Sequence, residues 1–320
     1  MTPENRRKIL VTGGAGGLGN IFTHRFVREG YTVRVFDLPT PANKKLFTGN
    51  EKNIEVFWGD ITREKDVMKA MEGTDIALHL AAILVPNTEK NPELAHRVNV
   101  GGTELVARAA AAESEKRDTP IPLLFSSSVT VYGHTHDETP PITQAHPLNP
   151  TDNYSETKIK AEEIVSTCGL PWTIFRFAAT LYLTIRPGDF GQMRMIPPDN
   201  RIEIAHLYDV CDAIVTSLEL DEARGKVFVL GGGPKMQMLY REQIMRTFDM
   251  FGFPAPNWKK FTDKPFYLDW YDTEMEQRIL RFQKRDFDHY LADFKKGLGM
   301  KYFAMKYLAS PPMKLLGIHI

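Results

Sequence analysis

Tyr154 and Lys158 are the residues of this sequence whose types and spacing best fit a chemical role. They stand four residues apart, and the apolar pattern from Ile159 to Val165 continues a predicted helix. Residues four apart share one helix face, so the two side chains lie together. A nearby ammonium favours the phenolate form of a tyrosine, which lets the phenol accept or donate a proton. The pair predicts proton transfer at an oxygen atom, and an exposed helix pair is the alternative explanation of the spacing alone.

A run of three serines, Ser126 to Ser128, follows the strand predicted from Leu123 to Ser126. In a parallel sheet the carboxyl ends of the strands form the edge where ligands bind. A serine hydroxyl at this edge can polarise the oxygen of a substrate, whereas capping of the strand end is the alternative role. The serines and the tyrosine–lysine pair together predict chemistry at a hydroxyl-bearing or keto carbon.

A glycine-rich turn follows the first predicted strand, Ile9 to Thr12, and opens a helix predicted from Leu18 to Arg28. A dinucleotide pyrophosphate can meet free backbone N–H groups and the helix dipole at such a turn. The glycines permit the tight turn and the close approach of the phosphates. We therefore expect cofactor contacts from Gly13, Gly16, Gly17, Leu18 and Gly19.

Asp37 follows the second predicted strand at the separation from the glycine turn that a ribose-binding carboxylate has. Its charge would repel a 2′-phosphate, and Leu38 and Pro39 offer no arginine to bind one, so the sequence favours NAD over NADP. Further cofactor contacts are expected after the third and fourth strands, from Asp60, Ile61, Leu80, Ala81 and Ala82. A helix cap is the alternative role for Asp60, and His79 is more simply a packed histidine.

Short apolar runs alternate with helical patterns in the first half of the chain, which predicts an α/β fold with a Rossmann-type doubly wound parallel sheet. Residues 1–178 are expected to form the NAD-binding domain with the catalytic residues. Residues 179–320 are expected to be mainly a smaller substrate-binding region, with some segments returning to the Rossmann domain. The strand candidates are Ile9–Thr12, Thr32–Phe36, Ile54–Trp58, Ile76–Leu80, Leu123–Ser126, Trp172–Phe175 and Lys226–Leu230. The later helix candidates are Tyr240–Phe251 and Phe287–Lys296, and residues 186–200 are expected to be irregular.

Composition narrows the classes of partner. The 320 residues are 42% hydrophobic and 25% charged, which is typical of a soluble globular protein. Forty basic residues balance forty acidic ones, so the attraction that non-specific nucleic-acid binding requires is missing. Cys168 and Cys211 lie too far apart for a zinc motif or a disulfide framework. Neither a signal peptide nor an apolar run of roughly 20 residues is evident, so a cytoplasmic location is expected.

The glycine turn, Asp37, the Ser128 run and the Tyr154/Lys158 pair together resemble the extended branch of the short-chain dehydrogenase/reductase superfamily, the NAD-dependent epimerase/dehydratase family. The resemblance is close over roughly the first 180 residues and looser beyond them. Nucleotide-sugar epimerases, sugar dehydratases and ketoreductases belong to this branch. The resemblance implies NAD as cofactor, a sugar or sugar nucleotide as substrate, and epimerase or dehydrogenase chemistry.

The resemblance also implies roles for individual residues. Asn99 is similar to the asparagine that bends a helix, contacts the cofactor and holds the proton relay, and Ser126 is placed for a further cofactor contact. Thr130 aligns with a substrate-contacting threonine. Arg176 and His206 match recurrent positions of the family.

The mechanism that the resemblance implies has Tyr154 removing the hydroxyl proton while hydride passes to C4 of the nicotinamide. Ser128 holds the substrate oxygen, and Lys158 holds the tyrosine and the nicotinamide ribose. Contacts with a small-molecule substrate are expected from Ser128, Thr130, Tyr154 and Arg186. A homodimer through the helices at 94–112 and 152–167 is also implied.

Other features leave the substrate open. No Asp-Glu pair follows Thr130 directly, which makes dehydration less favoured than epimerisation or oxidation. The segment between Arg176 and His206 is short for a nucleotide diphosphate site, so a smaller non-sugar alcohol or ketone is the alternative substrate. Phosphate contacts remain open for three arginines, Arg186, Arg194 and Arg201. Two loop histidines, His134 and His136, are more simply solvated than metal ligands, and we expect no metal site.

Two further alternatives concern the whole protein. The fold without catalysis would be a dinucleotide-sensing or scaffold protein, which the intact serine, tyrosine and lysine argue against. The C-terminal stretch interleaves lysines such as Lys301 and Lys306 with apolar residues such as Phe303 and Leu308. Such a segment can touch an anionic membrane surface, but packing of a terminal helix on its own domain or on a partner subunit is favoured.

Overall fold

The computed structural model describes residues 7–185 and 188–315, which fall into two compact units. The first unit contains the described residues of 7–131, 148–176 and 211–228, and the second contains those of 132–147, 177–210 and 229–315. Beyond residue 178, segment 211–228 lies in the first unit, and segment 132–147, within the range expected for the Rossmann domain, lies in the second.

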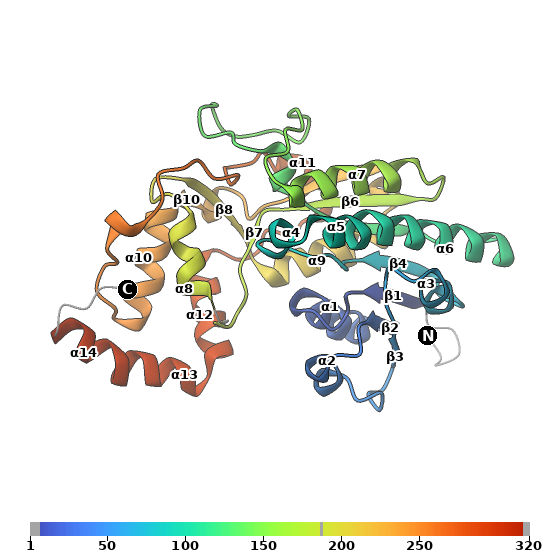
Figure 1. Cartoon of the computed structure of the whole chain (residues 1–320), viewed down its shortest axis with the longest axis horizontal. Coiled ribbons are helices and arrows are strands. Elements are labelled where there is room, and N and C mark those ends of the chain that lie inside the picture. Colours follow the sequence, from blue (N-terminus) through green and yellow to red (C-terminus); the bar gives the residue numbers. More distant parts are fainter. Residues whose placement is uncertain (1–6, 186–187, 316–320) are drawn as a thin grey trace. The chain divides into compact units, whose positions relative to one another are not determined.

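The first unit is organised by a seven-stranded sheet with the strand order β3-β2-β1-β4-β5-β6-β9 (Figure 1). β1 pairs in parallel with β2 and β4, β2 pairs in parallel with β3, and β4 pairs in parallel with β5. The chain runs outward from β1 to β3 and then returns to β4, so the direction of winding reverses between β1 and β4. This reversal is the point at which doubly wound sheets bind their ligands. The strands are β1 (Lys8–Thr12), β2 (Thr32–Asp37), β3 (Ile54–Trp58), β4 (Ile76–His79), β5 (Leu123–Ser128), β6 (Trp172–Phe177) and β9 (Lys226–Leu230).

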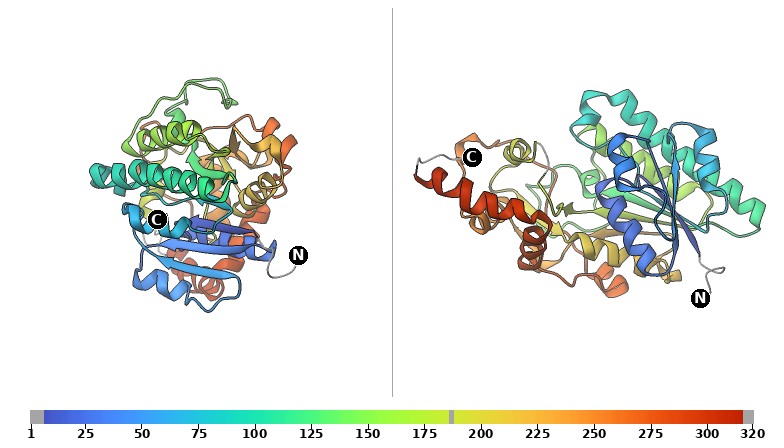
Figure 2. Two further views of the ribbon diagram at one scale, coloured as in Figure 1. Left: turned by 90° about the vertical axis from the view of Figure 1, so that its right-hand side faces the viewer. Right: turned by 90° about the horizontal axis from the view of Figure 1, so that it is seen from below.

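Helices cover both faces of this sheet. On one face α6 packs against α3 and α7, and Figure 2 shows α6 and α7 side by side. On α1, Arg25 forms an ion pair with Asp212 of α9. The helices are α1 (Gly17–Arg28), α2 (Pro41–Leu46), α3 (Glu64–Met71), α4 (Asn87–Lys90), α5 (Pro92–His96), α6 (Gly102–Arg117), α7 (Asn153–Thr167) and α9 (Leu207–Ser217).

Apolar side chains from the sheet and from α3, α6 and α7 form the core of the first unit. Leu10, Ala77 and Leu123 contribute from the strands, and Val106 and Ala161 contribute from the helices. All five are fully buried. Strands that are covered on both faces have to be apolar at nearly every position, which is why runs such as Ile-Leu-Val in β1 were readable as strands.

The strand pattern and the Rossmann-type α/β fold expected from the sequence are confirmed. The seven strand candidates match β1 to β6 and β9 with differences of at most two residues at their ends, and the helix expected at Tyr240–Phe251 is found with those bounds. Three short strands, the helix α9 and a helix at Glu274–Leu280 (α11) were not predicted. The expected irregular segment contains the one-turn helix α8 among its described residues.

The second unit contains a three-stranded sheet with the order β10-β8-β7. β8 pairs in parallel with β7 and antiparallel with β10. The strands are β7 (Ala179–Thr180), β8 (Arg201–Ala205) and β10 (Gln237–Leu239). The helices assigned wholly to this unit are α8 (Asp189–Gln192), α10 (Tyr240–Phe251), α11 (Glu274–Leu280), α12 (Phe287–Leu298), α13 (Met300–Phe303) and α14 (Ser310–Leu315).

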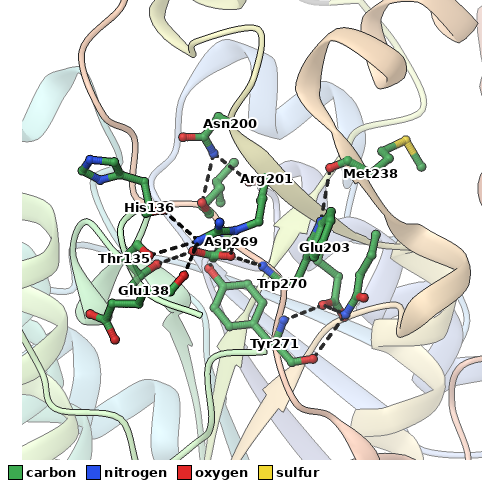
Figure 3. Close-up of polar contacts among 12 residues, drawn as sticks. Thr135, His136, Glu138, Asn200, Arg201, Glu203, Met238, Asp269, Trp270 and Tyr271 are labelled. Carbon is green, nitrogen blue, oxygen red and sulfur yellow. Dashed lines mark hydrogen bonds and ion pairs between the residues drawn. The ribbon is translucent and has the colours of Figure 1, made fainter. Parts of the chain in front are cut away.

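An arginine clamp at the start of β8 ties three segments of the second unit together (Figure 3). The Arg201 guanidinium pairs with both carboxylate oxygens of Asp269, at 2.6 and 2.8 Å. Its Nη2 also donates to the backbone carbonyls of Thr135, His136 and Glu138 at 3.1 to 3.2 Å. Asp269 is completely buried and also accepts the Thr135 hydroxyl. The clamp therefore fixes the 135–138 loop, and Arg201 is engaged within the protein.

The C-terminal helices pack on the second unit through one face. The Tyr302 hydroxyl donates to the Met250 carbonyl, and the Ser310 hydroxyl donates to the Gly252 carbonyl. On the other side Met300 and Leu308 are 88% and 74% exposed. The terminal packing expected from the sequence is thus present, and an exposed apolar edge accompanies it. No helix in the described part of the chain is both long enough and apolar enough to span a bilayer.

Replacing Arg201 with methionine should destabilise the protein by about 3–5 kcal/mol, because the buried charge of Asp269 loses its cation. The double variant Arg201→Met/Asp269→Asn should recover about 1 kcal/mol or more of that loss, since the uncompensated charge is removed as well. Free energies of unfolding from urea denaturation measure both effects. Arg246→Met, which breaks an ion pair with the exposed Asp288, is the control and should cost less than about 1 kcal/mol. Equal losses in Arg201→Met and Arg246→Met would show that the clamp carries no stability.

Candidate active site

The helix that carries Tyr154 and Lys158 begins at a well-defined cap. The Asp152 carboxylate accepts the backbone N–H of Ser155 at 2.7 Å, and the Ser155 hydroxyl accepts the backbone N–H of Asp152 at 3.2 Å. This reciprocal capping fixes the first turn of α7 and therefore the position of Tyr154 within it. The Lys158 Nζ atom lies 5.8 Å from the centroid of the Tyr154 ring. The spacing of four residues thus brings the two side chains together, as expected.

Lys158 is buried against the end of β5. Its Nζ donates a 2.6 Å hydrogen bond to the Ser126 carbonyl and lies 4.7 Å from the centroid of the Phe125 ring. The side chain is only 2% exposed. Burial lowers the pKa of Lys158 from 10.5 to about 7, and the negative charge of Glu162 opposes this shift. The lysine therefore changes between its protonated and neutral forms near neutral pH.

A buried ion pair supports the end of the helix face that carries Lys158, and it was not predicted. Glu162 lies four residues beyond Lys158 and pairs with Arg176 of β6 through contacts of 2.7 and 3.0 Å. It also accepts the Ser127 hydroxyl. The spacing from Lys158 to Glu162 and the arginine at a strand end were the available signals. Arg176, which was identified only as a recurrent family position, thus contacts the helix of the candidate site.

Asn99 lies in a π-helical turn, Arg97–Gly101, immediately before α6. Its amide forms two hydrogen bonds with the backbone of Ile83, accepting at 2.7 Å and donating at 3.0 Å. The same amide nitrogen lies 3.0 Å from the Thr157 hydroxyl on α7. The wide turn places the polar side chain between the segment after β4 and the candidate catalytic helix. Such turns are frequent at functional sites.

Ser128 and Thr130 lie at the carboxyl end of β5. The Ser128 hydroxyl oxygen accepts the backbone N–H of Thr130 at 3.2 Å, and Ser128 is 9% exposed, as is Tyr154. The Thr130 hydroxyl is buried and has no hydrogen-bond partner among the described residues. A buried hydroxyl without a partner costs free energy, so this atom is a candidate for contact with a bound molecule.

The glycine turn has room for a pyrophosphate because side chains are excluded from it. Gly13 has a φ of +67°, and a Cβ there would lie 2.9 Å from the backbone of Ala81. A Cβ at Gly19 would collide with the carbonyl oxygen of Gly13. Helix α1 starts at Gly17 without a side-chain cap or an acidic residue in its first turn. The N–H groups at this end of a twelve-residue helix are therefore suited to an anionic ligand.

Asp37 connects the end of β2 to the glycine turn. Its Oδ2 accepts the backbone N–H of Ala15 at 2.9 Å, and its Oδ1 accepts that of Leu38 at 2.8 Å. Burial raises the pKa of Asp37, while the backbone donors at Leu38, Ala15 and Gly16 lower it. The carboxylate is thus placed beside the turn, where the residues present fit the ribose and pyrophosphate of a dinucleotide.

The other expected cofactor contacts lie after β3 and β4. Asp60 accepts the N–H and the hydroxyl of Thr62, and α3 begins only at Glu64, so Asp60 closes a turn and does not cap the helix. Ile61 follows it. Leu80 and Ala81 donate their backbone N–H groups to the Thr12 hydroxyl at 3.2 Å each, which holds the segment containing Ala82 against β1.

His79 is a packed histidine, as expected. It is 1% exposed and lies between the hydroxyls of Thr12 and Thr103, at 2.7 and 3.0 Å from its ring nitrogens. Burial, with a smaller contribution from the charge of Lys158, lowers its pKa to about 3. The ring is therefore neutral, and its contacts with Thr12 and Thr103 connect β4 to β1 and to α6.

Several residues considered from the sequence are not brought into this site. Arg186, expected to contact substrate, lies outside the described residues. Arg201, considered for phosphate, is engaged in the clamp with Asp269. His134 and His136 are exposed, and the described residues contain no cluster of three or more potential metal ligands.

Comparison with known proteins identifies the family. Residues 9–198, more than half of the chain, match the NAD dependent epimerase/dehydratase family. The chain belongs to this family, an NAD-dependent group of enzymes of the extended short-chain dehydrogenase/reductase type. The matched range includes the glycine turn, Asp37 and the Ser128, Tyr154 and Lys158 set.

Curated relatives show the range of chemistry among similar proteins. The UDP-glucose 4-epimerase of Lactobacillus helveticus is 34% identical over 181 residues, which are 53% of this chain and 51% of that protein. The decarboxylating sterol-4-alpha-carboxylate 3-dehydrogenase of Mus musculus is 30% identical over 186 residues, 58% of this chain and 46% of that protein. The chain thus spans about half the length of the curated relatives it matches.

Solved structures show the same fold over most of the chain. A short-chain dehydrogenase/reductase superfamily protein from Agrobacterium tumefaciens with bound NAD aligns with a TM-score of 0.73 and 24% identity. The alignment covers 93% of this chain and 98% of that protein. At this identity the likeness establishes the fold.

The free energy of unfolding should depend on pH through Lys158. Between about pH 7 and pH 10 the unfolded chain keeps a proton on this lysine that the folded chain has released, so stability rises with pH. The slope due to this one group is about 1.4 kcal/mol per pH unit at most. Chemical denaturation of the wild type and of Lys158→Met across this range measures it. The variant should lose this part of the slope, whereas Lys160→Met, at an exposed position of the same helix, should keep it. Parallel curves for wild type and Lys158→Met would contradict the lowered pKa.

Replacing Asp37 with asparagine should relax the preference for NADH over NADPH. The negative charge opposes a 2′-phosphate, so its loss should reduce the ratio of the two dissociation constants on the order of tenfold, which is about 1.4 kcal/mol. Fluorescence titration with both reduced cofactors measures the ratio. Asp118→Asn, at an exposed position after α6, is the control. An unchanged ratio in Asp37→Asn would remove Asp37 from the ribose site.

Proposed function

We propose that the protein catalyses NAD-dependent hydride transfer at a secondary alcohol or keto carbon, with Tyr154 as the acid/base. The observation that carries this proposal is the placement of Tyr154, buried Lys158 and Ser128 around the end of β5, on the sheet that also presents the glycine turn and Asp37. The NAD-dependent family to which the chain belongs supports the same reaction.

Tyr154 takes up and returns the proton in the proposed reaction. In the oxidation, the Tyr154 oxygen takes the proton of the substrate hydroxyl, and the Ser128 hydroxyl holds the same oxygen by a hydrogen bond. NAD, when bound, supplies the nicotinamide carbon that accepts the hydride, so the alcohol carbon is oxidised and the cofactor is reduced. In the opposite direction Tyr154 returns the proton. The reaction thus balances as one proton and one hydride removed from the alcohol.

Lys158 acts on this step through its charge and its hydrogen bonds. One N–H of its ammonium is used by the Ser126 carbonyl among the described residues. An ammonium has three donors, so two remain for a ribose hydroxyl. In its protonated form, which predominates below about pH 7, its positive charge near the Tyr154 ring favours the deprotonated phenol that takes up the substrate proton.

Asn99 and Glu162 support this arrangement without touching the reacting atoms. Asn99 connects the segment after β4 to Thr157 on the catalytic helix. Glu162 and Arg176 connect the same helix to β6. Orientation of this kind matters because a small displacement of the reacting groups slows the reaction strongly. We assign both residues positioning roles.

Three features bear on the choice among family reactions. The UDP-glucose 4-epimerase among the relatives supports a sugar or sugar nucleotide as substrate, with epimerisation or oxidation as the outcome. Val131 follows Thr130 where dehydratases of this branch usually carry an Asp-Glu pair, so elimination of water is disfavoured. The sterol dehydrogenase among the relatives supports a non-sugar alcohol as the second candidate.

Replacing Tyr154 with phenylalanine should remove most turnover and leave cofactor binding intact. The phenol oxygen is lost while the ring remains, so activity should fall on the order of 100-fold or more. Turnover is followed as NADH formation from secondary alcohols or as epimerisation of UDP-glucose, and NADH binding is followed by fluorescence. Tyr307→Phe, at a 61% exposed tyrosine, is the matched control. Full activity of Tyr154→Phe would overturn the acid/base assignment and favour a dinucleotide-sensing role.

A further inference from the structure

The chain forms one continuous helical run from Met300 to Leu315, made of α13, a π-helical segment and α14 (Figure 1). One side of this run packs on the end of α10. There the Tyr302 hydroxyl donates to the Met250 carbonyl. The Ser310 hydroxyl donates to the Gly252 carbonyl, and both of these donor residues are only 3% exposed. Two polar anchors thus fix which side of the run is turned toward the second unit.

Large apolar side chains lie exposed on the same run. Met300, Phe303, Tyr307 and Leu308 are 88%, 57%, 61% and 74% exposed. Their positions, i, i+3, i+7 and i+8, follow the spacing of one helix stripe. The rings of Phe303 and Tyr307 stack on each other with centroids 6.3 Å apart, so these two side chains lie side by side. A contiguous apolar row in water, unlike a single exposed leucine, is typical of an interaction site.

Lysines border this row. The Lys306 Nζ atom lies 3.1 Å from the Tyr302 hydroxyl and 5.9 Å from the centroid of the Tyr307 ring. The Lys295 Nζ atom lies 4.8 Å from the centroid of the Tyr302 ring, and Lys301 is exposed on the run itself. Such lysines lay their methylene stems along apolar surface and keep the ammonium group outside it. The row therefore combines apolar side chains with positive charge at its border.

The charge of this segment has one sign. Residues 294–320 contain five lysines and neither aspartate nor glutamate, whereas the whole chain has forty basic and forty acidic residues. The exposed Asp249 adjoins Met250 on α10, so the element on which the run packs adds one acidic residue nearby. The local excess of positive charge fits a negatively charged partner. It disfavours the same face of a second copy, because the lysines of the two copies would repel each other.

A bilayer with anionic lipids offers both components that such a face requires. Apolar side chains such as Phe303 and Leu308 can enter the boundary between headgroups and acyl chains. The lysines then meet the lipid phosphates, and tyrosine rings such as that of Tyr307 are typical of this boundary. An acidic protein would match the charge, but it would also have to supply an apolar groove for the row.

We propose that this basic apolar face, formed by Met300, Phe303, Tyr307 and Leu308 with the lysines beside them, binds the surface of an anionic bilayer. The run lies along the headgroup boundary and does not cross the bilayer. This inference goes beyond the proposed function, since none of these residues belongs to the candidate active site.

Co-sedimentation of the full chain with vesicles tests the inference. Vesicles of equal parts of phosphatidylcholine and phosphatidylglycerol should bind the protein about tenfold or more tightly than vesicles of phosphatidylcholine alone, because the lysines are attracted to the anionic headgroups. Added salt should weaken this binding, since it screens the same attraction. The wild type should bind NADH with the same affinity with and without vesicles, because the face lies outside the cofactor contacts.

Replacing two lysines of the face tests its charge. Lys301→Gln/Lys306→Gln should weaken binding to the anionic vesicles by about tenfold or more, because each lysine near such a surface contributes about fivefold. Lys65→Gln/Lys69→Gln, at exposed positions of α3, removes the same charge and is the matched control. It should bind the vesicles as the wild type does.

Replacing two apolar residues of the face tests its contact with the bilayer. Phe303→Ser/Leu308→Ser should also weaken binding by about tenfold or more, because two side chains no longer leave water on binding. Leu46→Ser/Leu148→Ser, at leucines that are 48% and 40% exposed, is the matched control. Equal NADH affinity and equal urea midpoints establish that all four variants are folded.

Three results would overturn the inference: no binding to the anionic vesicles, equal binding to both kinds of vesicle, or unchanged binding by both double variants of the face. Sedimentation equilibrium tests the other occupant. Dimers of the wild type that Phe303→Ser/Leu308→Ser abolishes, without vesicle binding, would assign the face to a second copy of the chain. The result of the vesicle experiments does not depend on turnover, so the proposed function and this inference can fail separately.

Discussion

Burial of the Lys158 amine is the constraint on which the candidate site depends. Lys158 is 2% exposed, so its ammonium group loses most of its hydration. The Ser126 carbonyl, the Phe125 ring and the nearby charge of Glu162 replace only part of the lost hydration free energy. The pKa near 7 expresses this balance. A less buried lysine would have a pKa nearer its ordinary value of 10.5 and would stay protonated at neutral pH. Its ammonium group would then lie in solvent and away from the tyrosine.

The surrounding structure follows from that burial. Glu162 can lie within reach of Lys158 in the interior because Arg176 neutralises it through two short contacts, and the Ser127 hydroxyl satisfies it further. The same pair joins α7 to β6, and Asn99 joins α7 to the segment after β4 through Thr157. Among these polar groups Glu162 has a second role, because its negative charge favours the protonated form of the buried lysine.

The sequence predicted the strands of the first unit and the proximity of Tyr154 and Lys158 better than it predicted the second unit, for a physical reason. Strands covered on both faces need continuous apolar runs, and the catalytic pair shows helical spacing, so both leave local signals. Strand β8 contains Glu203, which is fully buried and accepts hydrogen bonds from Gly233, Gln237 and Tyr271. A carboxylate in the middle of a strand looks like surface sequence, because its donors come from residues 30 to 68 positions away. The π-helical turn at Asn99 also has no local signal, since its polar partners are set by the fold.

Arg201 shows how the chemistry of a residue type can mislead when only the sequence is known. An arginine near a proposed substrate region suggests phosphate, but this guanidinium pairs with Asp269 and donates to three carbonyls. The clamp therefore engages Arg201 within the protein. The partners that the fold brings to this arginine thus decide its role, and no pattern near position 201 reveals them, since Asp269 lies 68 positions away.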